Sequence, residues 1–210
     1  MDIEEIKKIT NKVDGWLTDN EGALLYNLAK KCTGKGVIVE IGSWKGKSTI
    51  LLAKGSKDGN KTKIYAIDHH TGSSEHRLNG NKVWTFDDFK NNIKNAQVDD
   101  IIIPIVKTSE QAAKDFNMPV ELLFIDGAHE YEFVKQDFEL WFPRLINKGI
   151  IAFHDTTEWP GPKKVVEESI RNSKYFKNIN LIDSITYAQK NQLPKERFRD
   201  KFLLFFKKRW

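Results

Sequence analysis

Aspartate and histidine residues gather directly after several apolar runs of this 210-residue sequence. The residues that share this position are Asp68, His69, His70, Asp126, His129, His154 and Asp155. Histidine accepts a proton near neutral pH, because its unperturbed pKa is about 6.5. Aspartate accepts hydrogen bonds from hydroxyl groups. These residue types therefore predict a site that binds a polar ligand and can move a proton.

Short apolar runs without polar alternation precede these residues or contain them. The five runs span 37–41, 63–68, 101–106, 121–126 and 149–154. Runs of this kind suit strands that are buried on both faces. Most are separated by stretches that we expect to be helical, at 48–54, 86–96, 109–116, 131–145 and 162–173. This alternation predicts an α/β fold, with a mostly parallel, Rossmann-like sheet of seven strands covered by helices on both faces.

The two ends of the chain follow a different pattern. Residues 1–34 predict an N-terminal helical extension, and residues 35–210 predict the Rossmann-like core of a single domain, 1–210. Segments 179–187 and 202–207 read as two strands with no helix between them. We expect them to form a C-terminal antiparallel hairpin at one edge of the sheet.

Ligands of open α/β sheets bind beyond the carboxyl ends of the strands. Besides the residues above, Gly42-Ser43 and Thr108-Ser109 follow predicted strands. Three of the five strand ends carry aspartate, histidine or both, and a purely structural sheet gives no reason to concentrate them there. The chemistry is therefore expected at this edge.

The glycine loop at residues 40–48 has the pattern Glu40-x-Gly42-x-x-x-Gly46-x-Ser48. A P-loop would need glycine at Ile41, and a dinucleotide fingerprint would need glycine at Trp44, so both are excluded. Gly42 permits a sharp turn and a close approach to a ligand.

This pattern resembles motif I of the class I S-adenosylmethionine-dependent methyltransferases. The resemblance implies S-adenosylmethionine as cofactor, with Glu40 bonded directly or indirectly to its methionine end and Asp68 to its ribose hydroxyls. The strand-end residues Thr108 and Ser109 then fall beside the adenine. The complete implied cofactor set is Glu40, Gly42, Ser43, Gly46, Ser48, Asp68, His69, Thr108, Ser109 and Asp126.

A second motif runs from Phe124 to Tyr131 and continues at 149–155. It resembles a bacterial subgroup of these enzymes that includes O-methyltransferases of sugars and hydroxylated natural products. Some members of the subgroup bind a divalent metal ion, and by position the ligands here would be Asp126, His154 and Asp155. The ion would be Mg²⁺ or another divalent cation: the histidine and two aspartates are a credible set for a transition metal, whereas Mg²⁺ prefers all-oxygen ligands.

His129 is the predicted proton acceptor for an acceptor hydroxyl, with Asp126 beside it. Because the sulfonium of the donor is already a good leaving group, the protein mainly has to align oxygen, methyl carbon and sulfur. The stretch from His69 to Trp84 is either a substrate loop or a disordered surface loop. The candidate contacts of a substrate loop are His69, His70, His76, Arg77 and Trp84. Trp159, after the fifth strand, could stack on a ring or a sugar face.

The composition and motifs of the sequence limit the expected location and binding partners of the protein. The single cysteine, Cys32, excludes a disulfide framework within the chain, and no run approaches the roughly 18 apolar residues of a membrane span. These features, with no signal-peptide pattern, indicate a cytoplasmic protein. A nucleic-acid substrate is not expected, since Asp126-Gly127-Ala128-His129 differs from the Asn/Asp-Pro-Pro-aromatic motif of base methyltransferases. The expected acceptor is a small molecule or a sugar, and the N-terminal helices and edge hairpin are candidate surfaces for a homodimer.

Two other functions are compatible with the same residues. A protein of this fold could bind S-adenosylmethionine without catalysis, because fold does not fix function. Alternatively, His129, His154 and Asp155 could hold iron or zinc in a metal-dependent enzyme of another class.

Overall fold

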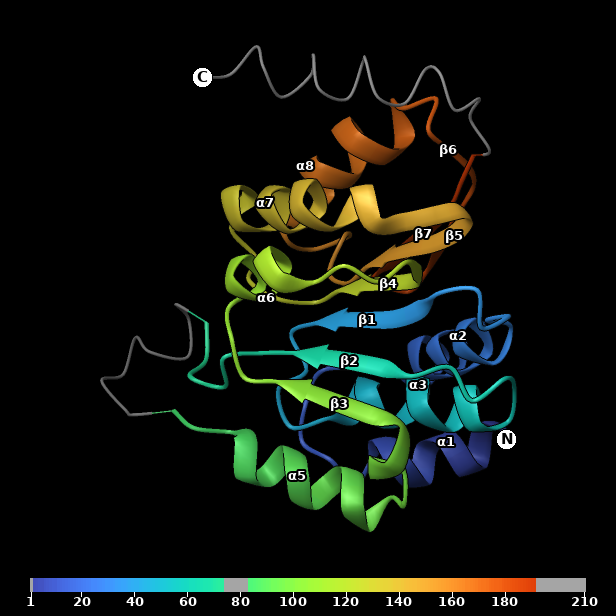
Figure 1. Ribbon diagram of the computed structural model, residues 1–210, viewed down its shortest axis with the longest axis vertical. Helices are drawn as coiled ribbons and strands as arrows, with labels where there is room; N and C mark the ends of the chain where they lie inside the picture. The colour runs from blue at the N-terminus through green and yellow to red at the C-terminus, as the bar shows by residue number, and fades with distance from the viewer. Residues whose placement is uncertain (1, 74–82, 192–210) are drawn as a thin grey trace.

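The sheet is the centre of the computed structural model, which describes residues 2–73 and 83–191. Its strands are β1 (Val37–Ile41), β2 (Ile64–Ile67), β3 (Ile102–Ile105), β4 (Val120–Ile125), β5 (Leu145–Phe153), β6 (Phe176–Ile182) and β7 (Ile185–Lys190). They lie in the order β3-β2-β1-β4-β5-β7-β6 (Figure 1). Strands β1 to β5 are parallel, and β7 is antiparallel to both β5 and β6. The predicted Rossmann-like sheet with an antiparallel C-terminal hairpin is confirmed.

The bounds of the hairpin were predicted wrongly. A single strand at 179–187 does not form, because the chain turns between β6 and β7 at Asp183, whose φ is +48°. Apolar residues on both sides of this two-residue turn conceal it in the sequence. The other predicted strand, 202–207, lies outside the described residues.

One predicted helix is also too long. The helix expected at 131–145 is α7 (Tyr131–Trp141), followed by a single 3₁₀ turn over Phe142–Arg144. Pro143 lies within that turn and cannot supply a backbone donor for a longer helix. Leu145 therefore already belongs to β5.

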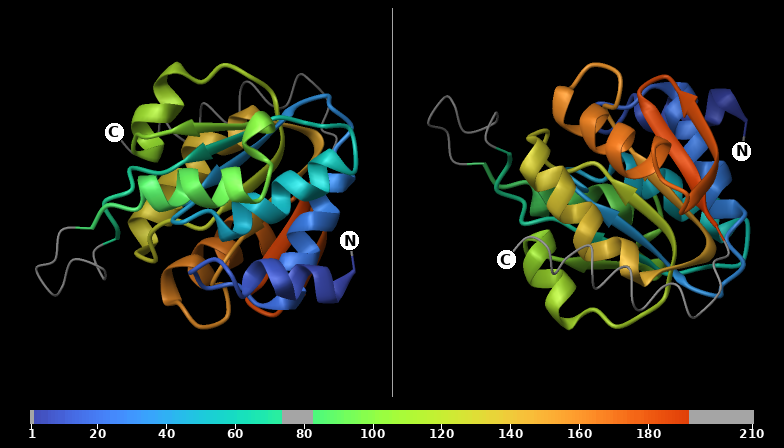
Figure 2. Two further views of the ribbon diagram at one scale, coloured as in Figure 1. Left: turned by 90° about the horizontal axis from the view of Figure 1, so that it is seen from below. Right: turned by 90° about the horizontal axis from the view of Figure 1, so that it is seen from above.

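Helices cover both faces of the sheet (Figures 1 and 2). On one face lie α1 (Ile3–Thr10), α2 (Asp19–Lys30), α3 (Lys47–Lys57) and α5 (Phe86–Asn95), and on the other α6 (Ser109–Asp115), α7 and α8 (Pro160–Val166). Neighbouring strand residues separate into the two cores: Ile38 packs in one and Val39 in the other. This double burial explains why the strands have no polar alternation.

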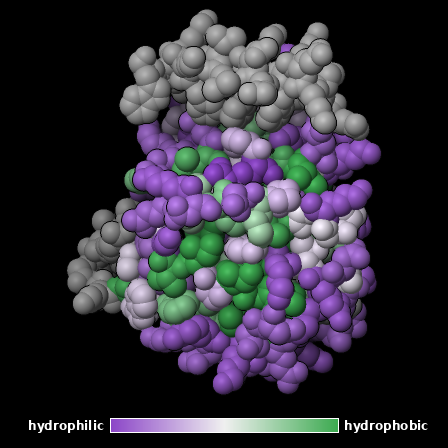
Figure 3. Space-filling model, viewed as in Figure 1, coloured by the Kyte–Doolittle hydropathy of each residue, from purple (hydrophilic) through white to green (hydrophobic). Residues whose placement is uncertain are grey.

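Strand β3 forms one edge of the sheet, and the surface near it is apolar (Figure 3). Ile103 and Ile105 are half-buried, and Val106, just after the strand, is 41% exposed. None of the helices in residues 2–73 and 83–191 has the length and apolar character required to cross a membrane.

The carboxyl ends of β1 and β4 come unusually close together. Gly42, after β1, has φ +85°, and a Cβ placed there would lie 1.9 Å from the carbonyl oxygen of Asp126, after β4. Only glycine fits this crossing. The contact brings the glycine loop beside the second predicted motif.

Candidate functional site

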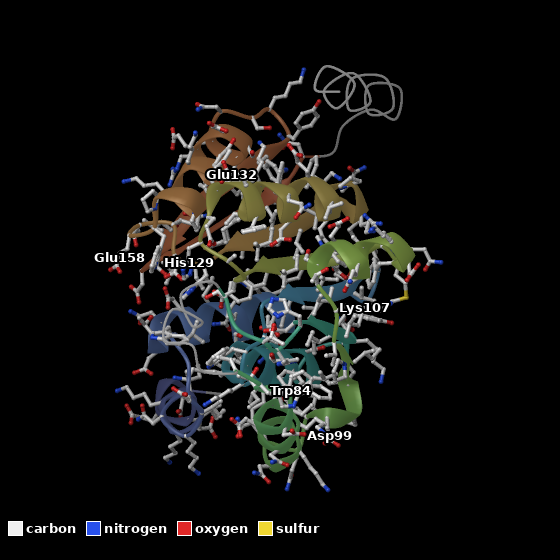
Figure 4. All side chains as sticks on the ribbon, turned by 90° about the vertical axis from the view of Figure 1, so that its left-hand side faces the viewer. Trp84, Asp99, Lys107, His129, Glu132 and Glu158 are labelled. Carbon is white, nitrogen blue, oxygen red and sulfur yellow. The ribbon has the colours of Figure 1, made fainter. Side chains whose placement is uncertain are left out.

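A cavity of about 1190 Å³ opens at the carboxyl ends of the parallel strands. Figure 4 looks onto this edge, with His129 and Glu158 on one side and Lys107 on the other. The predicted site residues that line the cavity are Gly42, Ser43, Ser48, Asp68, His69, Thr108, Ser109, Asp126, His129, His154 and Asp155. Residues spread over 113 positions of sequence therefore share one space, as the strand-end argument required.

Asp68 holds the glycine loop in place. Its carboxylate accepts hydrogen bonds from the backbone N–H groups of Ser43 at 3.0 Å, Trp44 at 2.8 Å and His70 at 2.6 Å. A carboxylate has about four acceptor positions, so these three bonds leave room for one further donor. Asp68 thus shapes the loop besides facing the cavity.

Glu40 lies behind the loop and outside the cavity wall. Its side chain is 0% exposed and accepts hydrogen bonds from Ser48 Oγ at 2.6 Å and from Thr49 Oγ1. Burial raises the pKa of Glu40 to about 8, although the two hydroxyls oppose this shift. The side chain therefore braces the first turn of α3, and any effect on a ligand would pass through Ser48. Gly46, with φ +91°, precedes α3 and likewise lies outside the lining.

A hydrogen-bonded chain of Trp141, Ser109 and Asp137 lies next to α6. Thr108 caps that helix, and Ser109 Oγ accepts a hydrogen bond from Trp141 Nε1 at 2.8 Å. Ser109 also bonds to Asp137, whose pKa is raised to about 7 by burial. Asp137 lines the cavity but was not among the predicted site residues, because its helical neighbours Val134 and Phe138 are core residues.

Two histidines and two aspartates meet where β4 and β5 end. His154 Nδ1 lies 3.0 Å from Asp126 Oδ1 and 3.0 Å from Asp155 Oδ2. His129 Nε2 lies 3.0 Å from the same Asp155 oxygen. Burial alone would raise the pKa of Asp155, but hydrogen bonds with His129 and His154 hold it well below its usual range. Burial raises the pKa of Asp126.

His154 is held from its other side by a residue of the N-terminal extension. Its Nε2 lies 3.3 Å from Glu21 Oε2, and both side chains are buried, at 5% and 2% exposure. Burial would raise the pKa of Glu21, but hydrogen bonds from His154 and Ser184 lower it to about 2. Burial would lower the pKa of His154, but Asp126, Asp155 and Glu21 together raise it far above its usual value.

The donor atoms of Asp126, His154 and Asp155 fit a divalent cation. One ligand atom from each lies within 4.8 Å of the others, and the two distances from Nδ1 are 3.0 Å. Two ligands at right angles, each about 2.1 Å from an ion, are separated by about 3 Å. Nδ1 faces two carboxylate oxygens, so a cation, either a proton or a metal ion, is required between them.

Aromatic side chains surround the mouth of the cavity. Trp159 stacks on His129 with ring centroids 4.1 Å apart and planes inclined by 20°. Trp16 is 67% exposed and Phe133 54% exposed, and both line the opening. Exposed rings gathered at a cavity mouth indicate a surface for an apolar or planar ligand group.

The predicted loop 69–84 divides into residues with different surroundings. His69 lines the cavity. His70 is buried at 1% exposure, with Nδ1 2.9 Å from Thr85 Oγ1, and does not line it. Trp84 is exposed and donates to Asp87, away from the cavity. The other predicted contacts, His76 and Arg77, lie outside the described residues.

The N-terminal region and the β6–β7 turn also contribute residues to this site, and the sequence did not predict them. Glu21 and Trp16 come from the N-terminal region, and Ser184 comes from the β6–β7 turn. Thr18-x-x-Glu21 fits a helix capping box, which marks the start of a helix but carries no sign of burial. Only the tertiary structure brings these residues to the strand ends.

Comparison with known proteins assigns the central part of the chain. Residues 39–156, more than half of its length, match a family model described as a methyltransferase domain. The chain is 31% identical over 121 residues to the uncharacterized protein y4gI of Sinorhizobium fredii, covering 57% of this chain and 13% of that protein. It is 30% identical over 148 residues to the uncharacterized protein R132 of Acanthamoeba polyphaga mimivirus, covering 65% of this chain and 62% of that protein. The chain therefore spans less than two thirds of either relative.

A solved structure shares the fold at low sequence identity. It is the O-methyltransferase TomG from Streptomyces achromogenes, involved in tomaymycin synthesis and solved in complex with S-adenosylmethionine. The TM-score is 0.63 at 14% identity, over 90% of this chain and 89% of that one.

Proposed function

The chain belongs to the methyltransferase domain family, and from this premise we propose that it transfers a methyl group from S-adenosylmethionine to a hydroxyl oxygen of a small-molecule or sugar acceptor. One observation carries the proposal: the glycine loop and the His129–Asp155 pair line the same cavity. A methyl donor bound at the glycine loop would therefore lie in the same cavity as a residue that can accept a proton.

The cavity is large enough for two ligands. Pockets that hold one drug-sized ligand measure roughly 300–1,000 Å³, and this cavity has about 1190 Å³. In the proposal, Gly42, Ser43 and Asp68 hold the methionine and ribose parts of the donor, and Thr108 and Ser109 face its adenine. The acceptor lies between the donor and the aromatic mouth, where Trp159 supports a ring.

The proposed reaction is an in-line methyl transfer. An electron pair of the acceptor oxygen forms the new O–CH₃ bond while the CH₃–S bond breaks. Sulfur keeps that bond's electron pair and loses its positive charge, and the hydroxyl proton moves to His129. Asp155, 3.0 Å from His129 Nε2, orients the ring and stabilises the imidazolium that forms.

Metal assistance is the finer part of the proposal. Asp126, His154 and Asp155 would hold the ion, and the nitrogen ligand favours Mn²⁺, Fe²⁺, Co²⁺ or Zn²⁺ over Mg²⁺. When bound, a divalent ion lowers the pKa of an acceptor hydroxyl and fixes its orientation. Independently of the ion, the side chains of this cluster position the acceptor beside His129.

A methyl-labelling experiment tests the proposal. The protein is incubated with S-adenosylmethionine carrying a ¹³C-methyl group and with a panel of phenols, catechols and sugars. The proposal expects acceptor-dependent formation of S-adenosylhomocysteine and the label on an oxygen atom. Label on nitrogen or carbon contradicts the assignment to oxygen, and donor binding without turnover across the panel favours a non-catalytic binding protein.

A further inference from the structure

Glu21 is a buried carboxylate on α2, outside the part of the chain that matches the family model. Its Oε1 accepts hydrogen bonds from Ser184 N at 2.9 Å and from Ser184 Oγ at 2.6 Å. Its Oε2 accepts from Thr18 N at 2.9 Å and lies 3.3 Å from His154 Nε2. This one side chain thus joins the N-terminal extension, the β6–β7 turn and the end of β5.

These contacts determine how the His154 ring is protonated. Every other partner of Glu21 donates a hydrogen to it, so the carboxylate acts only as an acceptor. His154 Nε2 must therefore carry a hydrogen and donate it to Glu21. The remaining nitrogen, Nδ1, faces Asp126 Oδ1 and Asp155 Oδ2 at 3.0 Å each.

We propose that Glu21 is a positioning residue for a metal centre: it holds His154 in the Nε2–H tautomer, so that the lone pair of Nδ1 points to the ion. The inference rests on the metal part of the proposed function. Histidine ligands of metals commonly donate their second nitrogen to a carboxylate, which fixes the ring and increases its basicity. Here the carboxylate is supplied by α2, so the segment before residue 39 completes the centre.

Helix capping alone does not account for this residue. Among the helices of residues 2–73 and 83–191, three begin with a capping box, and the residue at the third helical position is Glu5 in α1, Glu21 in α2 and Gln111 in α6. Glu5 and Gln111 are exposed, and a neutral glutamine is sufficient in α6. Only Glu21 of the three is buried, and it alone has a histidine partner. The contact with His154 distinguishes Glu21 from the other two residues. Glu5 has the same capping role without this contact, so it provides a matched control.

Cobalt titration of Glu21→Gln and Glu5→Gln tests the inference. Co²⁺ is added to each variant and to the wild type, and its visible absorption reports both affinity and ligand set. We expect Glu21→Gln to bind Co²⁺ about 10- to 100-fold more weakly, with an altered spectrum. Glu5→Gln, which changes the same capping position in α1, should keep wild-type affinity. Wild-type Co²⁺ affinity and spectrum in folded Glu21→Gln would overturn the inference.

S-adenosylhomocysteine binding separates this inference from the methyltransferase proposal. Its affinity should be the same in all three proteins, since the partners of Glu21 are Thr18, His154 and Ser184, and the proposal assigns none of these to the donor. A wild type that binds S-adenosylhomocysteine but no Co²⁺ refutes the metal centre and the role of Glu21, and leaves methyl transfer standing.

A measurement on the wild type covers the case in which Glu21→Gln does not fold. Long-range ¹H–¹⁵N spectra of the zinc-loaded protein identify the tautomer of each histidine. Hydrogen on His154 Nε2 supports the inference, and hydrogen on Nδ1 contradicts it.

Discussion

Replacing Glu40 by glutamine should make folding stability much less dependent on pH. The carboxyl group is completely buried beneath the glycine loop, and its pKa is raised from 4.5 to about 8. Burial is the largest cause, and the carboxylates of Asp126 and Asp68 add to it, whereas Ser48 and Thr49 oppose it. Between pH 4.5 and 8 the folded state keeps a proton that the unfolded state has released. Stability therefore falls as pH rises through this window and levels off above it.

The size of the effect follows from the width of that window. Between the two pKa values, the free energy of unfolding falls by about 1.36 kcal/mol for each pH unit, so the total loss from pH 4.5 to 8 is roughly 4 to 5 kcal/mol. Glutamine resembles the protonated carboxyl group in size and in hydrogen bonding. Its side-chain oxygen accepts a hydrogen bond from one hydroxyl group, and its NH₂ group donates one to the oxygen of the other hydroxyl group. Wild type and Glu40→Gln should thus be about equally stable near pH 4.5, and the variant should be more stable at pH 8.

Urea unfolding of both proteins at pH 5, 6, 7 and 8 measures the difference. Glu132→Gln, a change of an exposed helical glutamate, is the control and should alter stability by less than about 0.5 kcal/mol at every pH. Asp137→Asn should show the same sign over a window that ends near pH 7, because burial raises the pKa of Asp137 to about 7. A stability difference between wild type and Glu40→Gln that stays constant with pH would contradict a raised pKa of Glu40 in the folded state.

Three further substitutions test the site. His129→Ala should lower kcat about 10²- to 10⁴-fold with little change in the KM for S-adenosylmethionine, measured as S-adenosylhomocysteine formation with an accepted substrate; an unchanged kcat removes His129 as the base. Trp159→Ala should raise the KM for the acceptor about 2- to 10-fold, while the affinity for the donor, measured by calorimetry, stays constant. A loss of donor affinity would show that the indole contacts the donor and not the acceptor. Gly42→Ala should reduce the free energy of unfolding, measured in urea, by about 2–3 kcal/mol more than Gly34→Ala. A Cβ at residue 42 would lie 1.9 Å from a carbonyl oxygen, whereas a Cβ at residue 34 would have nothing within 4 Å. Equal losses in the two variants would contradict the tight crossing of β1 and β4.

The sequence was sufficient to predict the strand ends and the residues that meet there. Asp68, Asp126 and His154 each follow a continuous apolar run, and parallel strands place their carboxyl ends at one edge. The order of the strands does not alter this conclusion, so the site could be inferred before the topology was known.

Other features depend on contacts that no local pattern encodes. Glu21 reaches His154 across 133 positions of sequence, and its capping motif is shared with exposed Glu5. Glu40 was expected to bond to the donor directly or indirectly, and no local pattern shows that its side chain lies behind the turn at Gly42 with Ser48 and Thr49 as its partners. The hairpin turn at Asp183 was hidden because both flanking strands are comparably apolar.

Calorimetric titration of the wild type with S-adenosylmethionine measures whether the cavity binds the methyl donor. We expect saturable binding of one donor per chain in the micromolar range. Asp68→Ala should weaken it, because the glycine loop loses the acceptor of two of its N–H groups, whereas Glu40→Gln should retain it. No binding at donor concentrations up to about 1 mM, the upper end of ordinary substrate KM values, would contradict the claim.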